Sequence, residues 1–383
     1  MRHQRLRAVF MRGGTSKAVM LRAEDLPADR GQWDAIFLHI MGSPDADGRQ
    51  LDGMGGGVSS LSKVCVIGPP SRLDADVDYT FAQVAVREPL VDYGGNCGNM
   101  SSAVGPFALE EGLVPAPPDG EAVVRIHNTN TSKIIVARFP VAGGALAADG
   151  DFAIDGVAGR AAPIRLEFLD PGGARTGSLL PTGRACDELE AGDGEGAVAA
   201  SCVDAANPCV FVAAADLGKT GAELADELEA DAGFLERMER IRRAAAVRIG
   251  LAADPAAAAR QGSVPKVAVV SAPQAAATLS GRRLAASDAD ICVRMISMGQ
   301  PHRAVPITGA ICLAVAARVP GTVPHRLCRA PAGPIRIAHP SGITLVDAAV
   351  GADGPGGALR ARYGAVYRSA RRLFEGRVLY RMP

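Results

Sequence analysis

The pattern of apolar and polar residues along the chain predicts many short strands and few helices. β-Branched residues dominate six short segments bounded by polar or glycine-rich turns, a pattern typical of strands. These segments are residues 63–67, 78–85, 84–90, 122–126, 266–270 and 377–380. A longer helix is predicted to begin at Thr220, where Glu223 completes a capping box, and to run to about Arg248 with a candidate break at Gly233.

Two further helices are predicted to begin near Gly98 and Gly309. Both open with small and apolar residues and lack a polar face over their first turns, so we expect them to be buried at the centre of the protein. Many strands combined with few helices predict an α+β fold.

Three pairs of landmarks recur in the same order along the chain, at separations of 159, 203 and 211 residues. The pairs are Gly13-Gly14 with Gly172-Gly173, Lys63-Val64 with Lys266-Val267, and Cys97-Gly98 with Thr308-Gly309. A shared order with a growing separation is what a tandem duplication with insertions produces. We therefore expect two similar halves, residues 1–184 and 185–383, with the last strand a candidate to return to the first half.

Length and composition exclude several classes of protein. A chain of 383 residues exceeds the roughly 250–300 residues at which a single core stops growing, so two domains are expected. The 41 basic and 41 acidic side chains balance, which removes the electrostatic argument for a nucleic-acid partner. No apolar run approaches the roughly 20 residues of a membrane span, and the N-terminus lacks the apolar stretch of a secretory signal. We expect a cytoplasmic protein without a membrane partner.

The eight cysteines contain no CxxC pair and have no closely spaced histidines. In a long chain without a secretory signal they are interpreted as reduced thiols, most of them small core residues. The spacing does not suit a zinc site. Cys97 is the exception that requires a separate interpretation.

Cys97 lies in the segment YGGNCGNM, residues 93–100, directly before the first buried helix. Glycines on both sides allow a ligand to approach the backbone closely. The free N–H groups at a helix start stabilise a thiolate and can also hold a carboxylate. Asn96, Gly98 and Asn99 are therefore candidate binding residues beside a candidate catalytic thiol. The alternative is a structural turn around a core cysteine.

Lys63 follows a glycine loop, residues 52–57, and the hydroxyl residues that include Ser60. The order GxxxxGK[ST] is absent and a strand follows the lysine, so the segment does not indicate nucleotide binding. A lysine amine that loses its hydration at a strand end can serve as a base. The alternative is a solvated lysine that only marks the start of the strand. Lys266 has the same position in the second half.

Two further segments are rich in hydrogen-bond donors. Residues 11–17 place glycines and hydroxyls after a strand, which forms either an anion-binding nest or a hairpin turn. Residues 298–310 place a histidine and a second helix start together, which can bind a carboxylate, although a solvated loop histidine would have the same pattern. The candidate binding residues in these segments are Gly14, Thr15, Ser16, Met298, His302, Thr308 and Gly309.

Several strings resemble the PrpF family, which contains 2-methylaconitate isomerases, 4-oxalomesaconate tautomerases and methylitaconate isomerases. They are MRGGTSK, MGSPD, DGMGG, SSLSK, VDYGGNCGN, LEFLDPGG, PTG, SMGQPHRAVPITGA and HPSG, and they span residues 11 to 342. The resemblance implies the diaminopimelate-epimerase-like fold, in which two similar halves each wrap strands around a central helix and the site lies in the cleft between them. It also implies a homodimer, which is the commonest oligomer in general.

Carried over to this sequence, the resemblance assigns the family's catalytic lysine to Lys63 in SSLSK and its catalytic cysteine to Cys97 in GGNCGN. It implies a small polycarboxylate substrate and a 1,3-allylic proton shift without a cofactor. A base removes an allylic proton, fixed N–H donors hold the dienolate, and an acid returns a proton two carbons away. Lys63 is the leading base candidate, and Cys97 is its partner acid/base or a stabiliser of the enolate. Which of the two handles which proton stays open.

Three other functions are weighed against this one. Racemases of this fold use two thiols, whereas the residue matched to Cys97 is Thr308 and Cys312 lies one helical turn further along. A thiol hydrolase needs a histidine beside Cys97, and none is near in sequence. A non-catalytic accessory protein to an aconitase-like enzyme would bind the same acids but has no need of the lysine and the thiol. Methylaconitate, oxalomesaconate, aconitate and methylitaconate stay open as substrates.

Overall fold

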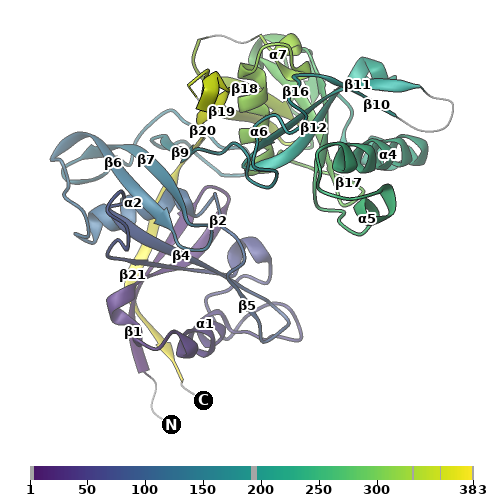
Figure 1. Cartoon of the computed structure of the whole chain (residues 1–383). Helices are drawn as coiled ribbons and strands as arrows, with labels where there is room; N and C mark the ends of the chain where they lie inside the picture. Colours follow the sequence, from purple (N-terminus) through teal and green to yellow (C-terminus); the bar gives the residue numbers. More distant parts are fainter. Residues whose placement is uncertain (1–3, 191–195, 330–331, 354, 382–383) are drawn as a thin grey trace. The chain divides into compact units, whose positions relative to one another are not determined.

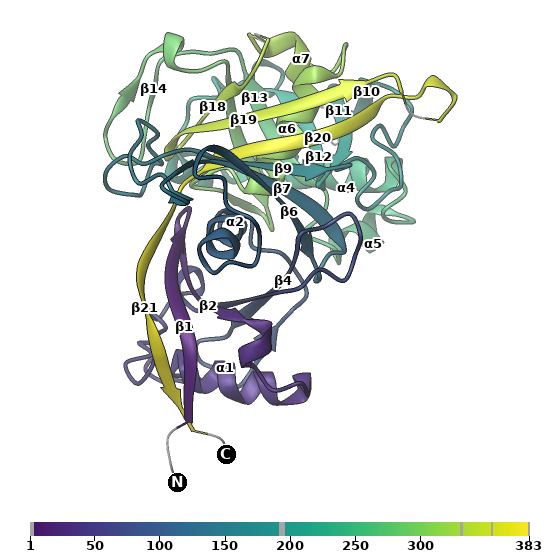
Figure 2. The ribbon, with the colours of Figure 1, turned by 90° about the vertical axis from the view of Figure 1, so that its left-hand side faces the viewer.

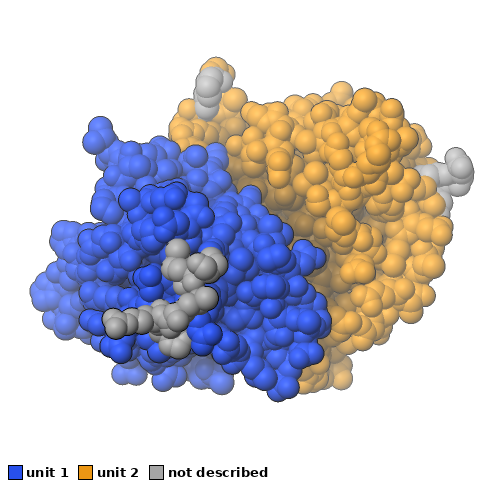
Figure 3. Space-filling view, turned by 90° about the horizontal axis from the view of Figure 1, so that it is seen from below, with its two compact units in different colours: residues 1–167, 367–383 blue, residues 168–366 orange. Residues whose placement is uncertain are grey.

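The computed structural model describes residues 4–190, 196–329, 332–353 and 355–381. The chain divides into two compact units, each described by itself (Figure 1, Figure 3). Unit 1 comprises residues 1–167 with 367–383, and unit 2 comprises residues 168–366. The expected boundary at residue 184 lies too late, because the segment after residue 169 already pairs with unit 2 strands: Gly172 forms a bridge to Ala205.

Unit 1 contains most of the strands of the first half together with the C-terminal strand. Its elements are β1 (Gln4–Gly13), β2 (Ser16–Arg22), α1 (Trp33–Met41), β3 (Lys63–Gly68), β4 (Val77–Val84), β5 (Val91–Asp92), α2 (Ser101–Glu110), β6 (Asp119–Asn128), β7 (Lys133–Ala142), β8 (Ala145–Leu146) and β21 (Ala370–Tyr380). β1 is antiparallel to both β2 and β21, so Gln4 pairs with Tyr380 and the ends of the described chain meet (Figure 1). β2 is parallel to β3, β3 antiparallel to β4, and β4 parallel to β6.

The two faces of β3 point toward different environments because side chains alternate along a strand. Val64 and Val66 face a core that also contains Ile36, Phe37 and Ile40 of α1. Lys63 and Cys65 therefore point to the opposite face. Every residue of α2 from 101 to 109 is buried. Figure 2 looks along this helix, and strands of unit 1 lie around it. The expected central, buried helix is confirmed.

Unit 2 contains the second set of strands and most of the helices. Its elements are β10 (Asp187–Glu190), β11 (Ala197–Ala205), β12 (Asn207–Ala213), α3 (Ala225–Glu229), α4 (Ala232–Arg248), α5 (Pro255–Ala259), β13 (Lys266–Ser271), β14 (Ala276–Ala277), β15 (Arg283–Leu284), β16 (Ile291–Ser297), β17 (Gln300–Pro301), α6 (Ile307–Arg318), α7 (Val323–Leu327), β18 (Ile335–His339) and β19 (Gly342–Gly351). The chain enters this unit within β9 (Ile164–Leu169) and leaves it within β20 (Arg360–Arg368). Residues 309–317 of α6 are all buried, as expected.

The two units have the same strand topology, which confirms the α+β class and the two similar halves. In unit 2, β11 and β12 form the hairpin, β12 is parallel to β13, β13 antiparallel to β16, and β16 parallel to β18. This order repeats the pairings of β1, β2, β3, β4 and β6. Lys63 and Lys266 are the first residues of equivalent strands, and α2 and α6 each follow a short strand, so two of the three landmark pairs are equivalent.

The third landmark pair is wrong. Gly14 lies in the turn between β1 and β2, whereas the equivalent turn between β11 and β12 is formed by Ala206, which has a φ of 61°. Gly172 and Gly173 lie beside that turn, where the N–H of Gly173 donates to the carbonyl of Asp204 at 2.8 Å. The match between the two glycine pairs therefore identified a segment beside the turn at Ala206, not that turn itself.

Three element boundaries also differ from the pattern-based prediction. Of residues 84–90, Val84 is the last residue of β4, and residues 85–90 form a loop in which the N–H of Ala85 donates to the carbonyl of Leu90. The helix expected from Thr220 begins at α3, because Gly221 has a φ of 84° that no helix accommodates. The break falls before Gly233, where the Asp231 carboxylate caps α4. No helix within the described ranges is long and apolar enough to cross a membrane.

Candidate active site

Lys63 occupies a buried position at the start of β3, with 7% of its surface exposed. Its amine donates a hydrogen bond to Oε1 of Gln83, which lies directly opposite on β4, and it lies 5.0 Å from the centre of the Phe81 ring. No carboxylate in the described part of the chain pairs with this amine. The lysine is therefore held by a neutral amide and an aromatic face, and its charge has no fixed counterion.

The Gln83 amide has a defined orientation. Its Nε2 donates to the backbone carbonyls of Ser59 and Ser62, at 3.0 and 2.8 Å, so its Oε1 must be the atom that faces Lys63. Ser60, a candidate binding residue, lies half-buried between these two carbonyls in the short 3₁₀ helix Ser59–Leu61. The glutamine thereby connects the hydroxyl segment to the lysine.

Gln50 connects the glycine loop to the same strand. It is 1% exposed, and its Nε2 donates to the hydroxyl of Ser62 at 2.8 Å while its Oε1 accepts from the N–H of Gly57 at 3.0 Å. Ser62 in turn donates to the carbonyl of Val84 on β4. The loop before Lys63 is thus fixed by one buried amide, a residue that the sequence patterns did not identify.

Cys97 lies half-buried in the turn that precedes α2. Its carbonyl accepts from the N–H of Ser101 at 2.9 Å, so α2 begins three residues later than Gly98, where the sequence placed it. Gly98 and Asn96 share this turn, and the amide oxygen of Asn96 accepts from the Ser101 hydroxyl at 3.3 Å. The candidate thiol therefore lies at the approach to a buried helix, as expected.

A second thiol, Cys65, lies two residues after Lys63 on the same face of β3. Burial raises the pKa of the Cys65 thiol far above its usual value, the charge of Cys97 raises it further, and Lys63 opposes the shift. Its Sγ lies 3.8 Å from the hydroxyl of Tyr79, whose own pKa is raised by burial. Both Lys63 and Cys97 thus influence the pKa of Cys65, which stays protonated. The position of Cys65 two residues after Lys63 on β3 already indicated that the two side chains share a face of the strand.

Residues 11–17 form a hairpin turn rather than a free nest. The N–H of Gly14 already donates to the carbonyl of Ser369 at 2.9 Å, and Ser16 is buried as the first residue of β2. The Thr15 hydroxyl instead accepts from Nδ2 of Asn99 at 3.1 Å. This bond joins the turn to the segment of Cys97, so the candidates of the first half lie together in unit 1.

The second half places an amine and a histidine together. The Lys266 amine donates to the hydroxyl of Ser297 at 2.8 Å, and burial lowers its pKa, an effect that Cys209 partly opposes. Burial and the charge of Lys266 lower the pKa of His302, whose Nε2 is buried without a hydrogen-bond partner among the described residues. His302 therefore resists protonation in a site of its own unit.

The other candidates of unit 2 differ in their exposure. The N–H of His302 donates to the carbonyl of Met295 at 2.7 Å, and a side chain at Gly309 would come within 2.5 Å of the Met295 sulfur. Thr308 is exposed in the first turn of α6, and Met298 is 66% exposed in the turn between β16 and β17. His302 and Gly309 are thus brought together, whereas Met298 points to solvent.

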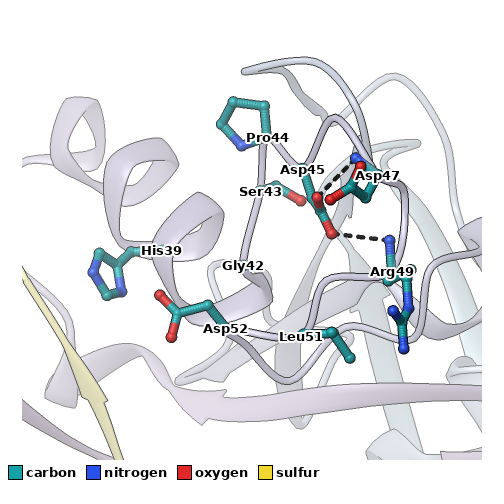
Figure 4. A pocket seen from close by; sticks show the side chains of 9 residues that line it. All are labelled: His39, Gly42, Ser43, Pro44, Asp45, Asp47, Arg49, Leu51 and Asp52. Carbon is teal, nitrogen blue, oxygen red and sulfur yellow. Dashed lines mark hydrogen bonds between the residues drawn. The ribbon is translucent and has the colours of Figure 1, made fainter.

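A separate cavity of about 370 Å³ lies between the end of α1 and the segment 42–52 (Figure 4). One of its three aspartates is Asp45, whose carboxylate accepts from the N–H groups of Asp47 and Arg49, as Figure 4 shows. Backbone N–H groups, first that of Gln50, hold the pKa of Asp45 below its usual value. These bonds shape the loop that carries Gln50, and neither Lys63 nor Cys97 lines the cavity.

The candidate groups of unit 1 are an amine and a thiol, which can transfer protons, and they include no set of metal ligands. In the parts of the chain that the structure describes, no group of three or more His, Cys, Asp or Glu side chains could hold a metal ion. An amine, a thiol and neutral hydrogen-bond donors are the available chemical groups. Such a set suits acid–base chemistry on an anionic carbon acid.

Comparison with known proteins agrees with the α+β fold class. A family model described as PrpF protein matches residues 3–381. The chain belongs to the PrpF family. The 3-methylitaconate isomerase of Eubacterium barkeri is 41% identical, covering 98% of this chain and 97% of that protein.

Two further relatives agree. The 2-methyl-aconitate isomerase of Shewanella oneidensis is 41% identical, with 98% of this chain and 97% of that protein covered. The 4-oxalomesaconate tautomerase of Pseudomonas putida is 40% identical, with 97% and 95% covered. A crystal structure of methylitaconate-delta-isomerase superposes with a TM-score of 0.91 at 40% identity, covering 99% of this chain and 96% of that one.

Proposed function

We propose that this PrpF-family isomerase moves a carbon–carbon double bond in a small unsaturated di- or tricarboxylate by a 1,3-allylic proton shift. The observation that carries the proposal is the buried Lys63 amine, which has a neutral amide as its partner and lies two residues before Cys65, a thiol whose pKa both Lys63 and Cys97 shift. The relatives are named isomerases and a tautomerase, which supports the same class of reaction.

The reaction requires a base, an acid and a means of holding negative charge. Lys63 in its neutral form removes the allylic proton that a conjugated carboxylate or ketone makes acidic. The electron pair moves into the conjugated system as a dienolate, and a protonated group returns a proton two carbons away. Cys97 is the partner acid/base or the stabiliser of the enolate. One proton leaves and one returns, so the reaction needs no redox partner.

The surroundings of Lys63 suit this role. A carboxylate beside the amine would hold it as an ammonium ion, and none pairs with it in the described part of the chain. Gln83 accepts one N–H and so directs the amine without neutralising it. The amine lies 5.0 Å from the centre of the Phe81 ring on another side. It is therefore held in a defined direction by neutral groups.

Each unit carries candidate binding groups of its own. The donor groups of Thr15, Asn99 and the turn at Cys97 lie in unit 1, and those of His302 and Gly309 lie in unit 2. We propose both sets as carboxylate-binding groups. The neutral His302 would donate or accept a hydrogen bond without changing the charge of the site.

The substrate is tested by a screen of four acids. Purified protein is incubated with 2-methylaconitate, 4-oxalomesaconate, aconitate and 3-methylitaconate, and the change in conjugation is followed by ultraviolet absorbance. We expect turnover of at least one acid, with deuterium from the solvent incorporated at the allylic positions. No turnover of any of them would favour the accessory protein, which binds such acids without converting them.

Three further properties belong to the same proposal. The reaction proceeds without a cofactor, the protein is a homodimer, and it acts in the cytoplasm. Activity that survives desalting and a chelator supports the first, and light scattering of the purified protein decides the second. Fractionation of the producing cells tests the third.

A further inference from the structure

Arg368, at the end of β20, is a buried cation without an acidic partner. It is 8% exposed, and burial lowers the pKa of its guanidinium to about 10. Its hydrogen bonds go to two neutral acceptors, from Nε to Oδ1 of Asn99 at 3.2 Å and from Nη1 to the carbonyl of Tyr367 at 2.9 Å. No carboxylate in the described ranges pairs with it.

The contrast with a neighbour on the next strand is informative. Arg372 is less buried and pairs with the carboxylates of Glu110, Glu111 and Glu375. Acidic side chains thus surround Arg372, four residues after Arg368, although water could also solvate the Arg372 charge. A more deeply buried guanidinium without a counterion costs free energy unless an anion arrives from outside.

Arg368 lies beside the groups of the candidate site in unit 1. Its partner Asn99 also donates to the hydroxyl of Thr15 and lies two residues after Cys97. A Cβ at Gly14 would approach Cδ of Arg368 to 3.2 Å, so the arginine stem packs against the backbone of the glycine turn. The guanidinium therefore lies between the turn of Gly14 and the turn of Cys97.

We propose that Arg368 binds a carboxylate of the substrate and so makes a polycarboxylate, rather than a monocarboxylate, the preferred ligand. The inference rests on the proposed function. A guanidinium presents several N–H donors in one plane that match the two oxygens of a carboxylate. Two hydrogen bonds to neutral acceptors leave further donors for this contact. The substrate anion then provides the missing countercharge, and Asn99 keeps the guanidinium in place.

The test measures binding of tricarballylate, a saturated tricarboxylate that has no double bond to move. Isothermal titration calorimetry compares wild type with Arg368→Gln and Arg368→Lys, and with Arg371→Gln as a matched control at an exposed neighbouring arginine. We expect the Arg368→Gln dissociation constant to rise by about 100-fold, in the range for removing one partner of a desolvated charge pair. Arg371→Gln should stay within about threefold of wild type.

A second readout separates carboxylate binding from a merely structural role. Wild type should bind tricarballylate far more tightly than its terminal monoamide, whereas Arg368→Gln should bind the two ligands with affinities within about threefold. A folded Arg368→Gln protein with wild-type affinity for tricarballylate overturns the proposal, and so does undiminished discrimination against the amide. If the Arg368→Gln variant does not fold, the Arg368→Lys variant provides the test, since lysine keeps the positive charge but lacks the planar guanidinium. It should bind at least tenfold more weakly, and wild-type affinity overturns the proposal.

The outcome is distinguishable from failure of the proposed function. Binding that depends on Arg368 in a protein that converts none of the four acids would support this inference and contradict catalysis. The opposite result is an Arg368→Gln variant that converts one of the acids with the wild-type KM and still binds tricarballylate far more tightly than its monoamide. That result would support catalysis and contradict this inference. Absence of tricarballylate binding to wild type also counts against the inference.

Discussion

The two units carry a lysine at the same position of the same strand, but the surroundings of the two amines differ. Lys63 faces the amide of Gln83 and the ring of Phe81, whereas Lys266 faces the hydroxyl of Ser297 and lowers the pKa of His302. The duplicated strand order explains why both units present an amine. The side chains opposite each amine decide its chemistry, and these have diverged.

The helix starts differ in the same way. Unit 1 carries Cys97 before α2, and unit 2 carries Thr308 in the first turn of α6. The buried Cys312 is no substitute, because its Sγ donates to the carbonyl of Val203 and burial raises its pKa well above the usual value. A reaction with one thiol in unit 1 is compatible with a proton shift, and the lack of an equivalent thiol argues against two-thiol racemisation.

The comparison between the two lysines predicts the largest effect. Lys63→Met should lower kcat by about 10³-fold, because the amine that transfers a proton is removed. Lys266→Met should lower it by about tenfold or less. Steady-state kinetics with the best acid, together with the melting temperature of each variant, provides the measurement. Equal losses in the two variants would show that the duplicated amines share the chemistry.

The comparison between the helix starts predicts the next effect. Cys97→Ser should lower kcat by about 100-fold, since a hydroxyl is a far weaker acid than a thiol. Cys328→Ser, a change at a half-buried thiol of unit 2, is the matched control and should stay near wild type. A loss of less than threefold for Cys97→Ser would remove a proton-carrying role for this thiol.

A smaller effect is expected from the partner of the first lysine. Gln83→Leu removes the acceptor that directs the Lys63 amine and also the anchor of the Ser59 and Ser62 carbonyls. We expect kcat to fall about tenfold with a changed pH profile and a KM within about twofold. Gln32→Leu, at a glutamine near α1, is the control. An unchanged pH profile would show that the amide is merely structural.

The smallest effect concerns the stability of unit 2 in acid. The pKa of His302 is lowered by burial and by Lys266, so the unfolded chain binds a proton at this residue more readily than the folded one. Stability should therefore fall as the pH drops from about 7.5 through the ordinary histidine pKa of about 6.5 and down to the lowered value. His302→Gln should weaken this pH dependence, as measured by melting temperatures between pH 5 and 7.5. Parallel curves for the two proteins would contradict the assignment.

Local strings were enough to name the candidate catalytic pair, Lys63 after a hydroxyl segment and Cys97 between glycines, and their roles stay a prediction. The supporting residues were not found. Gln50 and Gln83 have no local signature, because an amide becomes significant when a distant loop or strand supplies its partners.

The amino-acid sequence by itself determined the fold class, the repeated order of strands, the two buried helices and the family to which the chain belongs, because these follow from periodicity and from contiguous strings. Tertiary structure decided which side chains share an environment. Arg368 contacts Asn99 across 269 residues of chain, and no periodicity encodes such a contact. It also decided that the turn at Ala206, not the pair at Gly172, matches Gly14, since strand pairing sets equivalence between the halves.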